Sequence, residues 1–192
     1  MGVIKTALEI ALEKTESVKS DKSGIEQYEI TQKGKKLANC FLSGDADIQA
    51  ELKKALKEHK NSLKQGIFDV LVTQITLPGS NNDQTRMERA GLGLAAVIDK
   101  DEFSVMYRQF LQITAQFLQE VSQYEQAIRQ QYAPKLKQKE DELSRRLGRE
   151  VHIDPLHDPE FVAFYNQHMT ALKGNYEGIV EQVKGEARRL FQ

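Results

Sequence analysis

The sequence predicts an all-α protein, and two observations carry that prediction. Apolar side chains recur with the period of an α-helix through several long segments. The clearest segment holds nine apolar or aromatic positions at a mean spacing of about 3.6 residues: Phe103, Met106, Phe110, Ile113, Phe117, Val121, Tyr124, Ile128 and Tyr132. Strand signals are nearly absent, and the dipeptides that favour hairpin turns are missing as well.

The N-terminal half is predicted to form a short helix, a weakly marked segment and a long helix. A helix fits Val3–Lys19, whose apolar residues keep helical spacing. Residues 20–45 show weaker helical spacing and are interrupted by glycines, Gly34 among them. The apolar stripe of Ile48–Leu77 stays in phase throughout, so we expect one helix there. Pro78 ends it, because proline cannot continue the helical hydrogen-bond ladder.

Three further helices are predicted in the middle of the chain. A short one covers about Thr85–Ile98, and a long one covers Phe103–Tyr132. Another short helix covers Pro134–Leu147, which places a proline at its first position. Gly148 follows as the glycine that often ends a helix in the left-handed conformation.

The last helix begins with a capping sequence. Asp158, Pro159 and Glu160 stand in the favoured order of cap, first-turn proline and first-turn acid, and an apolar stripe follows to Leu190. Short turns between long helices predict an elongated antiparallel helical bundle with about three long helices and several shorter ones. No linker divides the sequence, so we expect residues 1–192 to form a single domain.

Composition excludes several classes of protein. The net charge of −1 gives no field that would attract nucleic acid or an anionic membrane, so neither partner is expected. A single cysteine excludes an internal disulfide framework and a cysteine-based zinc finger. No signal peptide and no apolar run long enough for a membrane span are evident, which favours a cytoplasmic protein.

Motifs for the common chemistries of helical proteins are missing. A di-iron site needs Glu-x-x-His pairs and a zincin needs His-Glu-x-x-His, and neither pattern occurs. Gly91–Ala96 matches G-x-G-x-x-A as letters but lies inside a helical pattern with no preceding strand, so we reject a dinucleotide site.

A short histidine and aspartate cluster could hold a metal ion. His152, Asp154 and His157 bring imidazole nitrogens and a carboxylate into one loop, and His168 could add a ligand from the next helix. The alternative is that Asp154 and Asp158 are turn and cap residues beside exposed histidines. We therefore expect no cofactor, and a divalent metal held by this cluster is the alternative.

Two other reactive side chains have simpler interpretations. His59 lies within the Ile48–Leu77 stripe and could be a base or ligand that faces a pocket. The favoured interpretation is a structural histidine that is hydrogen-bonded to a neighbouring helix or lies at the edge of the stripe. Cys40 stands beside apolar residues and is predicted to be a buried free thiol.

Three glycines of the last helix share one face. At about 100° per residue, Gly174, Gly178 and Gly185 fall on the side opposite the apolar stripe. They could form a smooth ridge against which a helix of a second copy packs, or they could be glycines that a solvent-exposed face tolerates. The first account predicts a homodimer.

The N-terminal segment resembles a known family. Ile4–Thr15, followed by Gly34–Ala38, is similar to the N-terminal part of an uncharacterised, all-helical bacterial family, a domain of unknown function. The resemblance implies a cytoplasmic bacterial protein and no activity, cofactor or catalytic residue.

We therefore expect a non-enzymatic helical interaction protein that acts through helix faces, on itself or on a protein partner. The alternative is a helical ligand- or metal-binding domain that uses the histidine and aspartate cluster.

Overall fold

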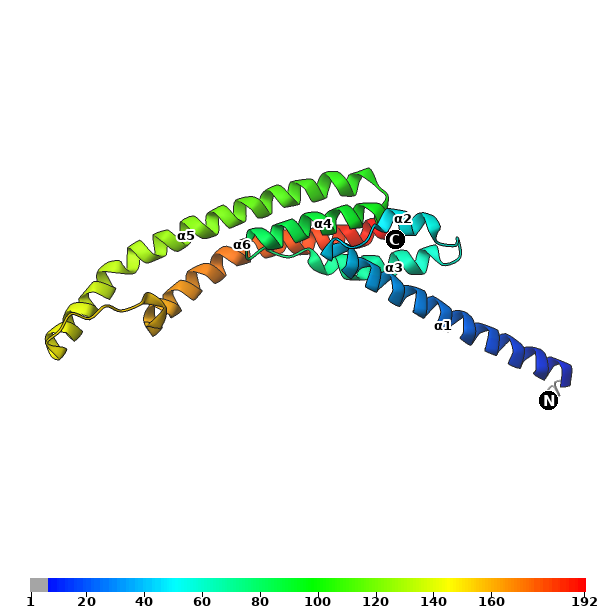
Figure 1. The fold of residues 1–192 in the computed structure, drawn as a ribbon, viewed down its shortest axis with the longest axis horizontal. Coiled ribbons are helices and arrows are strands. Elements are labelled where there is room, and N and C mark those ends of the chain that lie inside the picture. Colours follow the sequence, from blue (N-terminus) through cyan, green and yellow to red (C-terminus); the bar gives the residue numbers. More distant parts are fainter. Residues whose placement is uncertain (1–6) are drawn as a thin grey trace, which may run out of the picture. The chain divides into compact units, whose positions relative to one another are not determined.

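The chain is all-helical in the part that the structure describes. The computed structural model describes residues 7–192, with side chains from residue 23 onward. Its elements are α1 (Ala7–Ser43), α2 (Ile48–Lys54), α3 (Lys60–Leu71), the 3₁₀-helix η1 (Val72–Gln74), α4 (Asn81–Ile98), α5 (Asp101–Leu147), the 3₁₀-helix η2 (Pro155–His157) and α6 (Pro159–Phe191) (Figure 1). None of the described helices is long and apolar enough to cross a membrane.

The chain divides into two compact units. The first holds the chain up to Gln74, Glu88–Phe103 and Phe191, and the second holds Ile75–Met87, Ser104–Leu190 and Gln192. The expectations of a single domain and of an elongated bundle stay predictions.

A close contact between α1 and α3 organises the first unit. A methyl group built on Gly66 would lie 2.0 Å from the carbonyl oxygen of Thr31, and one built on Gly34 would lie 2.4 Å from that of Leu63. These distances are far shorter than any contact between a methyl carbon and a backbone atom. The two helices therefore touch backbone to backbone, and both glycines are required for that approach.

Helix α1 is longer than the sequence indicated. It runs without interruption through residues 20–43, including Gly34, so the glycines there do not break it. It ends at Ser43 and is followed by Gly44, whose φ of 96° is the left-handed conformation. The N–H groups of Gly44 and Asp45 donate to the carbonyls of Phe41 and Cys40, the pattern of a Schellman cap.

The predicted single helix over Ile48–Leu77 is wrong. Helix α2 ends at Lys54, because its cap residue Ala55 has an extended backbone with a φ of −65° and a ψ of 137°, and α3 begins at Lys60. A methyl built on Gly93 of α4 would lie 3.0 Å from Ile48 Cδ1 and 2.5 Å from Leu71 Cδ1. In one straight helix, residues 48 and 71 would be about 35 Å apart. The break lets both side chains reach α4.

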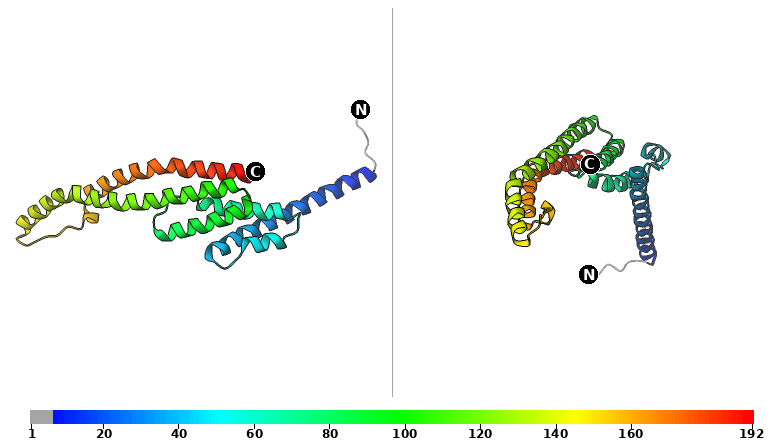
Figure 2. Two further views of the ribbon diagram at one scale, coloured as in Figure 1. Left: turned by 90° about the horizontal axis from the view of Figure 1, so that it is seen from above. Right: turned by 60° about the vertical axis from the view of Figure 1, so that its left-hand side comes forward.

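Helices α5 and α6 form an antiparallel hairpin in the second unit (Figures 1 and 2). Aromatic pairs mark their register: the ring centroids of Phe117 and Tyr176 are 5.0 Å apart, and those of Tyr132 and Phe161 are 5.3 Å apart. Between these pairs, the residue number rises along one helix by as much as it falls along the other. Parts of both predicted apolar stripes pack in one buried cluster here, with Phe117 and Ile128 from α5 and Phe161 and Leu172 from α6.

Helix α5 does not stop at a proline, which corrects its predicted division. Pro134 lies inside it and removes one donor from the ladder, which leaves the carbonyl of Gln130 without its helical partner. Both residues are exposed, so water can bind that carbonyl. The predicted end of the segment is confirmed, because Gly148 takes a φ of 65°.

Candidate interaction site

The outer face of α6 carries the predicted glycine ridge. No atom lies within 4 Å of a methyl group built on Gly174, Gly178 or Gly185, and all three residues are exposed. The buried residues of the helix lie on its other side: Phe161, Met169, Leu172, Val180, Val183, Ala187 and Leu190. Within the described part of the chain, nothing covers this ridge.

We expect Gly178→Ala to stabilise the isolated chain by about 0.4–1 kcal/mol, because alanine favours helix, restricts the unfolded chain and meets no atom here. Thermal and denaturant unfolding at low protein concentration measure this gain. If the ridge also joins two copies, the added methyl weakens that association, and sedimentation shows a lower average mass. A stabilised variant with unchanged mass would contradict the homodimer.

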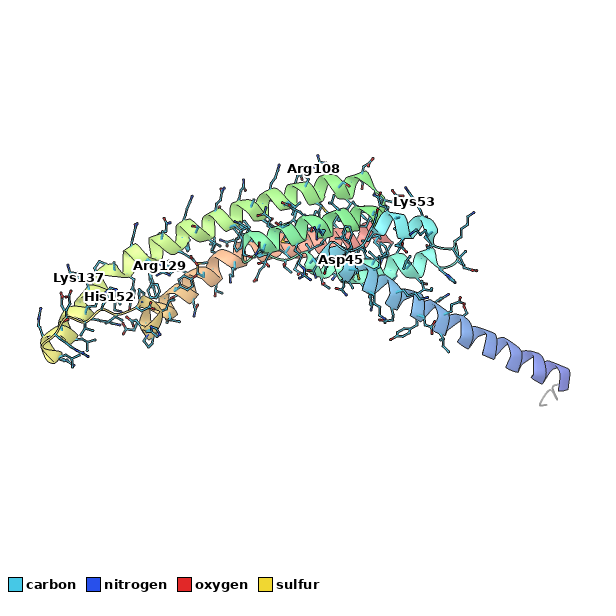
Figure 3. The ribbon with its side chains drawn as sticks, in the orientation of Figure 1. Asp45, Lys53, Arg108, Arg129, Lys137 and His152 are labelled. Carbon is cyan, nitrogen blue, oxygen red and sulfur yellow. The ribbon has the colours of Figure 1, made fainter. Side chains whose placement is uncertain are left out.

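Of the predicted metal ligands, the structure pairs Asp154 with His157, and His152 and His168 have other neighbours. His152 Nδ1 pairs with Glu140 at 2.9 Å, and His157 Nδ1 pairs with Asp154 at 3.4 Å. His168 lies on α6, where its ring centroid is 4.4 Å from that of Phe164. Figure 3 labels His152 in the loop that follows α5. No group of three or more potential ligands is found among the described residues.

The structure agrees with the interpretation of His59 but not with that of Cys40. His59 Nε2 lies 3.0 Å from Glu26 Oε1, so it is bonded to the neighbouring helix α1 as favoured. It stands at the start of α3 rather than within a continuous stripe. Cys40 is exposed, so the prediction of a buried thiol is wrong. The register explains this, because the buried positions of α1 beside it are Ala38 and Leu42.

A polar cluster closes the end of the α5–α6 hairpin. We call Tyr132, Lys135, Lys139, Asp158 and Glu160 the hairpin clasp. Asp158 caps α6 by accepting from the Glu160 N–H at 3.0 Å, as predicted, and its side chain is only 4% exposed. Lys139 Nζ lies 2.7 Å from Asp158 Oδ2 and 2.8 Å from Glu160 Oε2. The Tyr132 hydroxyl donates to Asp158 at 3.1 Å.

The charges of the hairpin clasp stabilise one another. The hydrogen bond from Lys139 lowers the pKa of the Asp158 carboxyl. Hydrogen bonds from Lys139 and Lys135 lower the pKa of Glu160 to about 2 from its ordinary 4.5. In return, the hydrogen bonds to Asp158 and Glu160 raise the pKa of Lys139 above its ordinary 10.5.

These shifts predict loss of stability in acid. The pKa of Glu160 is lower in the folded protein than in the unfolded chain. The ionised carboxylate therefore stabilises the fold fully above pH 4.5, and this stabilisation is lost as the pH falls towards 2. Lys139 acts oppositely, since its contribution is lost only above pH 10.5. We expect the thermal unfolding midpoint to change little with pH between these limits and to fall below pH 4. The fall should be smaller in Glu160→Gln, and an equal fall in both proteins would contradict the assignment.

A groove in the first unit combines lysines with an apolar floor. It has a volume of about 540 Å³, and its lining comes from α1, α2, α3 and α4 and the ends of these helices. We call it the lysine groove and define it by six of its lining residues: Phe41, Leu52, Lys53, Lys60, Lys64 and Leu92. Leu92 is the most exposed large apolar residue that the structure describes, at 71%. Figure 3 labels Lys53 on α2.

The lysine groove differs in its ion pairs from three other grooves in the described part of the chain. The grooves at Lys184, Lys54 and Lys139 each contain an ion pair between two of their own lining residues. Lys53 and Lys60 make no ion pair with any residue whose side chain the structure describes. Lys64 donates to the carbonyl of Val97 at 3.0 Å. The groove therefore keeps unmatched positive charge over apolar side chains.

Sequence reasoning missed this groove. Its residues are spread from position 41 to position 99, on segments whose meeting depends on the break after α2. The one available signal was Leu92, an apolar residue that lies off the buried stripe of α4 formed by Met87, Ala90, Leu94 and Val97. Gly91–Ala96 lies inside α4, in agreement with the rejection of a dinucleotide site.

The comparisons with known proteins give one match. A family model described as "Family of unknown function (DUF6657)" matches residues 49–189. No curated protein and no solved structure matches the chain significantly. The matched residues follow the N-terminal segment that suggested an uncharacterised helical family. They include most of the lysine groove and all of the α5–α6 hairpin except the last two residues of α6.

Proposed function

This chain belongs to the DUF6657 family of unknown function, and we propose that it is a non-enzymatic helical interaction protein that acts through its helix faces. The lysine groove is the observation that carries the proposal. Its floor is apolar, and Leu92 among its lining residues is 71% exposed. An exposed apolar residue beside an apolar hollow, ringed by polar groups, is typical of protein interaction sites.

A second copy of the chain is one candidate partner. The open ridge at Gly174, Gly178 and Gly185 would allow close approach of another helix, and the Gly178→Ala experiment tests it. The cytoplasmic location and the metal-binding alternative stay predictions, and no contact among His152, Asp154, His157 and His168 favours the latter beyond the pair of Asp154 and His157.

Site-specific cross-linking in cells tests the proposed function. A photoreactive amino acid replaces Leu92 at the groove in one variant and Arg108, an exposed polar residue of α5, in a control. We expect a discrete cross-linked product from position 92 that contains one identified partner sequence, or a second copy of this chain, and none from position 108. No product from position 92, or the same products from both positions, would contradict the proposal.

A further inference from the structure

We propose that the lysine groove binds an acidic, amphipathic α-helix of a partner protein. This inference rests on the proposed interaction function and adds the chemistry of the partner. An amphipathic helix presents apolar residues at every third or fourth position and can place acidic residues on either side of them. Such a helix matches both the floor and the rim of the groove.

The charge of the rim selects an acidic partner. Lys53 and Lys60 are exposed and have no carboxylate partner among the residues whose side chains are described. The opposing charges are fewer: the Asp47 carboxylate accepts from the N–H groups of Gln49 and Ala50, at 2.8 and 3.2 Å. Asp99 is the other acidic lining residue. Charge complementarity of this kind sets partner choice and the rate of encounter.

The floor and the open rim favour a helix over a small ligand. Phe41, Ile48 and Leu52 supply an apolar base from two helices, and Gly93 allows Phe41 and Ile48 to come close to α4. Small ligands are buried over most of their surface in their sites. Here Lys53 and Leu92 are exposed, so an occupant would cover them from outside while it fills the groove with a few apolar side chains.

Peptide titration tests the proposal. The probe is a labelled helical peptide with leucine at positions i, i+3, i+4 and i+7 and glutamate between them. The control peptide carries lysine in place of every glutamate. The full chain is titrated into each peptide and fluorescence anisotropy is measured. We expect saturable binding of the acidic peptide that weakens as salt rises, and no binding of the basic one.

Matched variants locate the binding. We expect Lys53→Glu with Lys60→Glu to weaken acidic-peptide binding about tenfold. The control is Lys57→Glu with Lys137→Glu, which makes the same change of net charge at exposed residues outside the groove and should leave binding unchanged. Leu92→Asp should also abolish binding, and circular dichroism shows whether each variant stays folded.

Three results would overturn the inference. The first is equal binding of the acidic and the basic peptide, and the second is binding of the acidic peptide that substitution of Lys53 and Lys60 does not weaken. The third comes from a titration with the fatty acid anion decanoate, if it binds stoichiometrically and the acidic peptide does not bind. The last result would assign the groove to a small anionic amphiphile. Cross-linking from position 92 together with any of these results would leave the interaction function standing and remove the acidic helix alone.

Discussion

Gly66→Ala is expected to destabilise the protein by about 3 kcal/mol, because it drives α1 and α3 apart. The new methyl would lie 2.0 Å from the Thr31 carbonyl oxygen and 3.1 Å from Gly34 Cα, and these backbone atoms cannot rotate away as a side chain would. Denaturant unfolding of the full chain measures the loss. Overpacking that can be relieved only by a backbone shift lies at the upper end of its usual range.

Gly24→Ala is the matched control. Gly24 lies on α1 with no atom within 4 Å of a built methyl group, so the same substitution should stabilise the chain by a few tenths of a kcal/mol to about 1. We therefore expect Gly66→Ala to lower the free energy of unfolding and Gly24→Ala to raise it. A Gly66→Ala protein as stable as the unchanged chain would show that the two helices do not touch at this point.

Asp158→Ala is expected to cost about 2–4 kcal/mol. The substitution removes the cap of α6 and the buried carboxylate that Lys139 and the Tyr132 hydroxyl share, so that both keep only the exposed Glu160. The expected loss is discounted from that of a fully buried ion pair, since the Lys139 side chain is 31% exposed. Thermal unfolding and amide exchange in the hairpin measure the effect.

Asp154→Ala is the control for this prediction. Asp154 caps the short η2 by accepting from the Leu156 N–H at 3.0 Å, and its side chain is exposed. Its removal should cost no more than about 1 kcal/mol, the value of an exposed cap. Equal losses from the two substitutions would show that the hairpin clasp adds nothing to the cap.

The fold class and most helices were predictable from apolar periodicity and from caps. The stripe from Phe103 to Tyr132 identified α5, and the order of Asp158 and Pro159 located the start of α6. Both signals act within one helix, which is why a sequence displays them. The break at Ala55 could not be predicted, because no proline or glycine marks it. It follows from the packing of Ile48 and Leu71 on the same part of α4.

The candidate sites also divide into features that one helix determines and features that depend on contacts between helices. The ridge at Gly178 follows from the geometry of one helix, and the structure leaves it open. The lysine groove joins residues of four helices, and Gly34 and Gly66 gain their importance only where two helices cross. In the hairpin clasp, the cap at Asp158 is local, whereas its pairing with Lys139 depends on the register of α5 against α6.

Amide hydrogen exchange of the full chain, with and without the acidic peptide, tests the lysine groove most directly as a docking surface. The account predicts slower exchange in α2, in the first turns of α3 and in the last turns of α4, the segments that line the groove. Exchange on the outer face of α6 should stay the same. Unchanged exchange in α2, α3 and α4, or slowing confined to α6, would contradict the account.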